Sequence, residues 1–230
     1  ETSEGYLKHF LLNDADRYEL KIAGLLHDCG KITTPEYVVD KGKKLETIFD
    51  RIGLIETRLE ILKRDAEIAL LRRHLQVHDN SELDNDIKIE LGSIVTSLED
   101  DLSFLKICNT GGEFMSQDKI DRLKVLQQKE WQLHGKTFPL LSLDEFDNLS
   151  IARGTLNDAE RKVINNHISA TISMLKAIKW PKHLKNVTAY AGGHHERMDG
   201  KGYPNGLTRE EMPIQARAMA IADVFEALTA

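Results

Sequence analysis

The most specific pattern in the chain is His194-His195-Glu196-Arg197-Met198-Asp199-Gly200-Lys201-Gly202-Tyr203-Pro204. Two adjacent histidines and a glutamate lead directly into a glycine-rich turn, a pattern far more specific than a single histidine. Further back along the chain stands Leu25-Leu26-His27-Asp28-Cys29-Gly30-Lys31, in which the glycine is a natural helix stop. We interpret both stretches as helix ends that carry chemistry.

Groups that bind metals occur at five places: His27-Asp28, His167, His194-His195, Glu196 and Asp223. Imidazole and carboxylate together suit iron, manganese or zinc. Adjacent residues on a helix point about 100° apart, so a His-Asp pair can reach one metal only where the helix ends. A bridging carboxylate can hold two ions that clamp phosphate oxygens and activate water. The set therefore favours phosphoester hydrolysis.

Each group also has an ordinary structural interpretation when it is taken alone. A His-Asp pair is common by chance, and His167 lies in the apolar stripe of a predicted helix, where a histidine is usually a satisfied core residue. The residues of this stripe that are predicted to be buried are Val163, Ile164, His167, Thr171, Met174 and Leu175. Asp223 lies on an alanine face and is harder to explain, because a buried carboxylate needs a partner or a metal.

Hydrophobic periodicity predicts an all-α fold, since no alternating strand pattern is convincing. Heptad spacing predicts a long helical arm over residues 44–137, with a third helix at 116–134. Its two apolar seams are Ile48, Ile52, Ile55, Leu59, Leu62, Ala66 and Ala69, and then Ile87, Leu91, Ile94, Leu98 and Leu105. The helical core is predicted over residues 1–43 and 138–230, so the arm is an insertion within it.

Composition narrows the function classes. The 230 residues are 41% hydrophobic and carry a net charge of −6, which supports a folded interior and argues against binding to a nucleic-acid polymer or a membrane surface. The two cysteines, Cys29 and Cys108, are too few for a disulfide framework. No run reaches the roughly 18 apolar residues of a membrane span. We expect a cytoplasmic protein, and an anchor or an upstream sensory domain in a longer chain stays open.

The quoted motifs resemble those of a known family. Residues 25–31 resemble the HD signature of the HD phosphohydrolase superfamily, and residues 194–204 resemble the HHE…DGxGYP signature of its HD-GYP branch. Ala222-Asp223-Val224-Phe225-Glu226-Ala227-Leu228-Thr229 is similar to the closing helix motif of that branch. The resemblance covers about residues 11–40 and 140–230. It implies an HD-domain helical bundle and a bacterial signal-transduction hydrolase, a phosphodiesterase that cuts cyclic di-GMP to linear pGpG and in some members onward to GMP.

The resemblance also implies residue roles. Asp28 bridges two divalent ions, with iron favoured and manganese or zinc as alternatives. Lys31 contacts the scissile phosphate and assists the leaving group. Glu196 supports the neighbouring histidines, while Gly202, Tyr203 and Pro204 shape a loop beside the site. The implied metal ligands are His27, Asp28, His167, His194, His195 and Asp223.

Three alternatives stay open. Residues 28–37 and the long arm resemble a subgroup of which some members cleave 3′,3′-cyclic GMP-AMP (cGAMP). A second alternative is a nucleotide phosphohydrolase of the wider superfamily, against which the HHE…DGxGYP segment at residues 194–204 argues. The third is a non-catalytic module that binds a cyclic dinucleotide. The arm, residues 44–137, is expected to mediate homodimerisation or regulation.

Overall fold

The computed structural model describes residues 4–5, 7–8, 10–76, 81–112 and 114–229. They form two compact units: one combines the chain up to Pro35 with the chain from Lys162, and the other is Glu36–Arg161. Helices make up most of both units, and the described residues contain one sheet, of two strands. The predicted all-α helical architecture is therefore confirmed. No helix in the described parts of the chain is both long and apolar enough to cross a bilayer.

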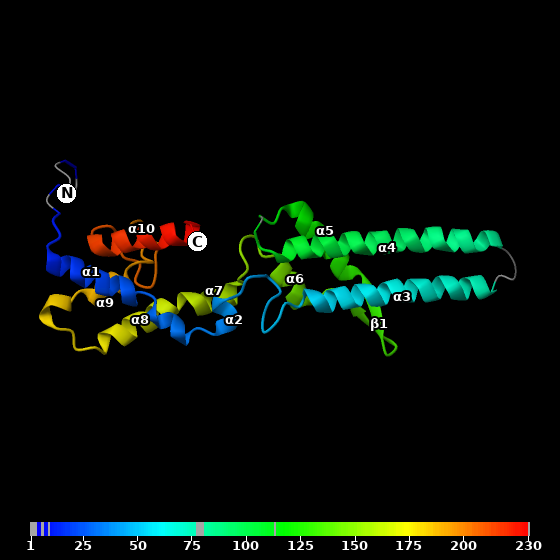
Figure 1. The fold of residues 1–230 in the computed structure, drawn as a ribbon, viewed down its shortest axis with the longest axis horizontal. Helices are drawn as coiled ribbons and strands as arrows, with labels where there is room; N and C mark the ends of the chain where they lie inside the picture. Colours follow the sequence, from blue (N-terminus) through cyan, green and yellow to red (C-terminus); the bar gives the residue numbers. More distant parts are fainter. Residues whose placement is uncertain (1–3, 6, 9, 77–80, 113, 230) are drawn as a thin grey trace. The chain divides into compact units, whose positions relative to one another are not determined.

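The first unit holds the two ends of the chain. Its helix α1 (Asp14–Leu26) begins at Asn13, which forms a reciprocal capping box with Asp16. The unit also contains the 3-10 helices η1 (Cys29–Thr33) and η2 (Lys182–Leu184), and the helices α8 (His167–Lys176), α9 (Val187–Gly192) and α10 (Ile214–Thr229), shown in Figure 1. Its core consists of Ala23, Leu175, Leu184, Val187, Tyr190, Ala191 and Met219.

The predicted apolar stripe around His167 is broken in two. Helix α7 (Asp158–Asn165) ends just before α8 begins, and Val163 and Met174 are exposed, so their predicted burial is wrong. The buried face is made instead by His167, Thr171 and Leu175. These residues are four apart and therefore lie on one side of α8.

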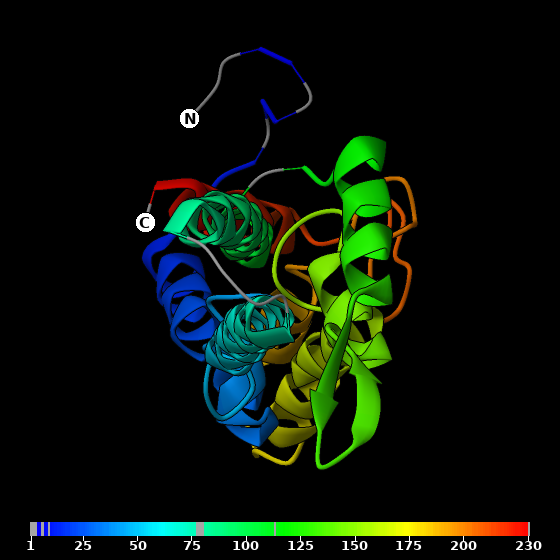
Figure 2. The ribbon, with the colours of Figure 1, turned by 90° about the vertical axis from the view of Figure 1, so that its right-hand side faces the viewer.

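The second unit is built on two long antiparallel helices, α3 (Ile52–Gln76) and α4 (Ser81–Asn109), which lie side by side in Figure 1 and are seen end-on in Figure 2. Ile55, Leu59, Leu98 and Leu105 are buried between them, as the heptad seams predicted. Ile48 does not belong to the seam, because it precedes α3 and is 94% exposed. The unit also contains α2 (Glu36–Val39), α5 (Gln117–Gln128) and α6 (Leu143–Leu149).

The predicted helix over residues 116–134 is wrong in its second half. Helix α5 ends at Gln128, and strand β1 (Glu130–Leu133) pairs antiparallel with β2 (Lys136–Pro139). The turn between them places His134 and Gly135 at positive φ, 50° and 70°. Such a two-residue turn matches the twist of a hairpin, and the glycine supplies the left-handed conformation.

The second unit extends beyond residues 44–137 on both sides. The Lys41 side chain is fully buried and its Nζ lies 2.8 Å from Glu160 Oε1. Leu140, Leu141 and Leu149 belong to the same apolar cluster as the long helices. The dimerisation or regulatory role of the arm stays a prediction.

We expect Arg58→Met to destabilise this unit by on the order of 3 kcal/mol at pH 7, because it leaves the buried Glu145 carboxylate unpaired. Arg58 binds both Glu145 oxygens at 2.7 and 3.0 Å. Burial alone would raise the pKa of Glu145, but Arg58 and the Ser142 N–H hold it below its usual value. The ion pair between Arg58 and Glu145 therefore stabilises the folded state fully above the pKa that glutamate has in the unfolded chain. This stabilisation is lost as the pH falls through the pKa of Glu145 in the folded state, which is lower.

Urea unfolding at several pH values measures this effect. The matched control is Lys124→Met, which removes an exposed ion pair with Asp121 and should leave stability close to that of the wild type. Equal losses in the two variants would contradict the prediction.

Candidate metal centre

The site begins where α1 ends. His27 is the C-cap of α1 and still has helical backbone angles, whereas Asp28 leaves the helix with φ −105° and ψ 10°. This change of direction turns both side chains to the same side, and His27 Nε2 lies 3.4 Å from Asp28 Oδ2. The His27-Asp28 pair therefore lies at a helix end, as predicted for two adjacent side chains that reach one metal.

Gly30 brings α8 against this helix end. Its backbone N–H donates to Thr171 Oγ1 at 2.9 Å. A Cβ atom at Gly30 would lie only 2.0 Å from the His167 carbonyl oxygen, so no other residue permits this approach. As a result His167 Nε2 lies 3.2 Å from Asp28 Oδ1, although the two residues are far apart in the sequence.

Helix α9 delivers the last two histidines. Its start is tied to α1 by the buried Glu19 carboxylate, which accepts from the Asn186 backbone N–H at 2.6 Å and from Asn186 Nδ2 at 3.1 Å. Just past the end of α9, the His194 and His195 rings lie with their centroids 4.2 Å apart. His194 Nε2 is 3.8 Å from Asp28 Oδ1.

Helix α10 contributes Asp223, whose Oδ1 lies 3.7 Å from His27 Nε2. The structure thus brings all six predicted ligands together in one place. Two groups have their ligand atoms within 4.8 Å of one another: His27, Asp28 and His194, and His167, His194 and His195. The two carboxylate oxygens of Asp28 face different neighbours, Oδ1 towards His167 and Oδ2 towards His27. This is the arrangement that a bridging carboxylate needs.

Three of the histidines are oriented by the same local device. The Nδ1–H groups of His27, His167 and His194 each donate to the carbonyl three residues earlier, at 2.5 to 2.6 Å. This bond fixes the tautomer, so Nε2 carries the lone pair in all three rings. Backbone carbonyls are common partners for the second nitrogen of metal-binding histidines.

The facing atoms are all hydrogen-bond acceptors. Asp28 Oδ1, His167 Nε2 and His194 Nε2 are buried, and none has a hydrogen-bond partner among the described residues. Two lone pairs 3.2 Å apart repel unless a cation lies between them, and buried polar atoms are seldom left unsatisfied. These residues therefore fit a bound metal ion.

The protonation states agree with this interpretation. Burial, together with His194 and His167, lowers the pKa of His195 to about 4. Burial also lowers the pKa of His194. Burial alone would raise the pKa of Asp28, but the Lys31 ammonium, 2.7 Å from Oδ2, favours its ionised form. Neutral imidazole and ionised carboxylate are the forms that bind metals.

Lys31 lies at the mouth of the cluster. Its Nζ is 2.7 Å from Asp28 Oδ2, and its side chain is 43% exposed. It is therefore a solvent-accessible cation beside the candidate metal ligands, suited to an anionic phosphate.

The predicted loop residues also lie at the site. The buried Glu196 carboxylate accepts the backbone N–H groups of Asn205 and Leu207. Gly202 packs against the backbone of Glu196, and the Tyr203 ring lies on His195. Pro204 is exposed and follows a cis peptide bond.

Glu19 was not identified from the sequence, and Thr171 was predicted to be buried but not to bind the Gly30 backbone. Glu19 falls in a helix with other charged residues, and only the fold shows that it is 4% exposed. Thr171 lies four residues after His167, on the same helix face, which was the available signal.

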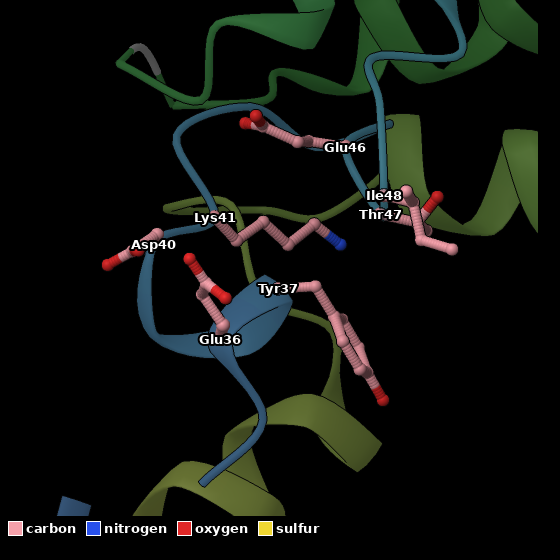
Figure 3. A pocket seen from close by; sticks show the side chains of 7 residues that line it. All are labelled: Glu36, Tyr37, Asp40, Lys41, Glu46, Thr47 and Ile48. Atoms are coloured by element: carbon pink, nitrogen blue, oxygen red, sulfur yellow. The ribbon is translucent and has the colours of Figure 1, made fainter. Parts of the chain in front are cut away.

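A separate pocket of about 440 Å³ lies in the second unit and offers no comparable chemistry. Figure 3 shows Lys41 between the Glu36 and Glu46 side chains. The charge of Lys41 is neutralised by both Glu160 oxygens at 2.8 Å. The remaining charged side chains that line the pocket are acidic, which disfavours an anionic substrate.

Comparison with known families identifies the architecture. Residues 144–230 match the model of the HD domain family. This part of the chain is therefore similar to HD domains. The match begins after the inserted helices, so the His27-Asp28 pair precedes it in the sequence. Members of this family are metal-dependent, in agreement with the His/Asp cluster described above.

Curated relatives confirm the resemblance to the HD-GYP branch. The 3′3′-cGAMP-specific phosphodiesterase 1 of Vibrio cholerae serotype O1 is 36% identical over 107 residues, 46% of this chain and 24% of that protein. A cyclic di-GMP phosphodiesterase response regulator of Xanthomonas campestris pv. campestris is 37% identical over 82 residues, 36% of this chain and 21% of that protein. A cyclic di-GMP phosphodiesterase of Thermotoga maritima is 34% identical, covering 36% of this chain and 22% of that protein. This chain thus spans about a quarter or less of these relatives.

Proposed function

We propose that this chain is the catalytic part of a metal-dependent phosphodiesterase that hydrolyses a cyclic dinucleotide. The observation that carries the proposal is the convergence of three buried, unsatisfied acceptor atoms, on Asp28, His167 and His194. The names of the relatives supply the substrate class, since those proteins are phosphodiesterases of cyclic di-GMP or of 3′3′-cGAMP.

In this proposal two divalent ions would be held by six side chains, those of His27, Asp28, His167, His194, His195 and Asp223. Iron is the favoured metal, and manganese and zinc are alternatives compatible with the same ligands. When bound, such ions polarise the phosphate and lower the pKa of a water molecule.

The side chains of the protein perform the remaining tasks. The Lys31 ammonium binds a non-bridging phosphate oxygen and offers a proton at Nζ to the departing ribose oxygen as the phosphorus–oxygen bond breaks. Its ion pair with Asp28 keeps Nζ beside the site. The carbonyl contacts of His27, His167 and His194 hold their rings still, so the site is preorganised before substrate arrives.

Cyclic di-GMP is the first candidate substrate, and 3′,3′-cyclic GMP-AMP is the second. The second is favoured by the relative whose alignment covers 107 residues of this chain. Both substrates share the phosphodiester that the cluster and Lys31 contact. The choice between them depends on hydrogen bonds to the bases, each worth about 1–3 kcal/mol.

Turnover of both dinucleotides by metal-loaded protein, with separation of linear and mononucleotide products, tests the proposal. We expect metal-dependent release of the linear dinucleotide. Binding of the dinucleotide without any product would instead support a non-catalytic module.

The substitution His167→Ala is expected to lower kcat/KM by at least about 100-fold, because it removes a buried ligand that adjoins Asp28. His183 is exposed in η2, and His183→Ala should retain wild-type turnover. If the two variants ranked in the opposite order, His167 would not be part of the centre.

Self-association through residues 44–137 is also part of the proposal. Helix α3 carries the exposed apolar side chains Leu54, Ile68, Leu71 and Leu75. Sedimentation equilibrium of the whole chain measures the oligomeric state.

A further inference from the structure

The residues between Asp199 and Thr208, here called the GYP loop, are held in one shape by their own backbone. A β-bridge between Asp199 and Thr208 closes the loop. The carboxylate of Glu196 accepts from the Asn205 N–H at 2.7 Å and from the Leu207 N–H at 2.8 Å. Glu196 is only 4% exposed, so these charge-assisted bonds are shielded from water.

This loop packs against the backbone of residues 195–197, which include the second histidine of the pair. A Cβ atom on Gly202 would lie 2.2 Å from the Arg197 nitrogen and 2.4 Å from Glu196 Cα. The next residue, Tyr203, donates its backbone N–H to the His195 carbonyl at 3.2 Å. Both contacts are between main chains, so they fix where the Tyr203 side chain begins.

The Tyr203 ring stacks on the His195 imidazole. The centroids are 4.9 Å apart and the planes differ by 15°. The two other rings near His195 meet it at larger angles, 40° for His194 and 85° for His167. Tyr203 is thus the neighbour that lies flat on the imidazole face.

His195 needs such a neighbour because it lacks the hydrogen bond to a backbone carbonyl that orients the other histidines. His27, His167 and His194 each donate Nδ1–H to a backbone carbonyl. No hydrogen bond to either ring nitrogen of His195 is found within the described part of the chain. An imidazole without that bond is free to rotate about χ2 unless a flat surface holds its plane.

We infer that Tyr203 is a positioning residue: its ring fixes the plane of His195 for metal binding, as the carbonyl bonds do for the other three histidines. The inference rests on the proposed metal centre and concerns metal binding, a property separate from hydrolysis. The ring carries this role, whereas the hydroxyl does not take part in it. Loss of such support around a ligand typically costs 10- to 100-fold in metal affinity.

Titration of metal-free protein with Co²⁺, followed by its visible absorption, tests the inference in the whole chain. We expect Tyr203→Phe to keep the wild-type spectrum and affinity, because it keeps the flat ring. Tyr203→Met fills a similar volume without a ring. It should lower the affinity for one equivalent of Co²⁺ by about 10- to 100-fold and change the absorption spectrum. Tyr18→Met alters an exposed tyrosine on α1 and should match the wild type.

The inference would be overturned if Tyr203→Met bound Co²⁺ as tightly as the wild type. It would also be overturned if Tyr203→Phe and Tyr203→Met lost Co²⁺ affinity equally. Urea unfolding verifies that each variant is folded, and Tyr203→Leu replaces the Met variant if that one is not. A wild-type chain that binds no Co²⁺ would overturn both this inference and the metal centre. A chain that binds Co²⁺ as described but hydrolyses no cyclic dinucleotide would overturn the proposed function alone.

Discussion

Replacing Gly30 by alanine is expected to disrupt the metal centre without touching any of its ligands. The added Cβ would lie 2.0 Å from the His167 carbonyl oxygen and 2.5 Å from the Thr171 nitrogen. Both are backbone atoms that cannot swing away, so η1 must move off α8. The 3.2 Å approach of His167 Nε2 to Asp28 Oδ1 is then lost. We expect the bound metal to fall below half an equivalent and the unfolding free energy to fall by about 3 kcal/mol.

Gly92→Ala is the matched control for this prediction. Gly92 lies in α4, and nothing beyond the backbone of its own helix lies within 4 Å of the place that an added Cβ would take. Alanine there should stabilise the helix by roughly 0.5–1 kcal/mol and leave metal content unchanged. Metal analysis and urea unfolding of both variants give the comparison. Full metal content in Gly30→Ala would show that the approach of η1 to α8 does not position the ligands.

Replacing Asp28 by alanine is expected to abolish hydrolysis while leaving the fold intact. Loss of the carboxylate that is proposed to bridge two ions should lower kcat/KM by on the order of 1,000-fold or more. In metal-free protein the same change should alter stability by less than about 1 kcal/mol, because it removes a part-exposed ion pair with Lys31. It also relieves the facing lone pairs of Asp28 and His167.

The measurements are turnover, metal content, and urea unfolding with and without a chelator. Asp14→Ala, which changes an exposed carboxylate in the first turn of α1, should behave as wild type in all three. Full turnover by Asp28→Ala would contradict the two-metal proposal. A large loss of stability in the metal-free state would show that Asp28 has a structural role instead.

Local features of the site could be predicted from the sequence. The His27-Asp28 pair directly precedes Gly30, and a helix stop at that point turns both side chains to one side. Asp223 could be identified because an alanine face lets another helix approach a carboxylate.

Long-range features could not be predicted in the same way. The contact between Asp28 and His167 depends on Gly30 meeting α8 across the whole inserted unit, and periodicity carries no information about such distances. The partners of Glu196 were missed for a similar reason. Its carboxylate binds the backbone of a loop that follows it, and a side chain's backbone partners leave no pattern in the sequence.

The hairpin was missed because it is short. Each of its strands has four residues, and the alternation of Trp131 and Leu133 is too brief to distinguish from a continuing helix. The His134-Gly135 pair was the available turn signal.

Anomalous X-ray diffraction from crystals of the metal-loaded chain, recorded at the absorption edge of the metal, tests the central claim most directly. We predict two anomalous peaks, with Asp28 between them, among the side chains of the six proposed ligands: His27, Asp28, His167, His194, His195 and Asp223. Metal-loaded crystals with no peak in this cluster, or with peaks only elsewhere in the chain, would contradict it.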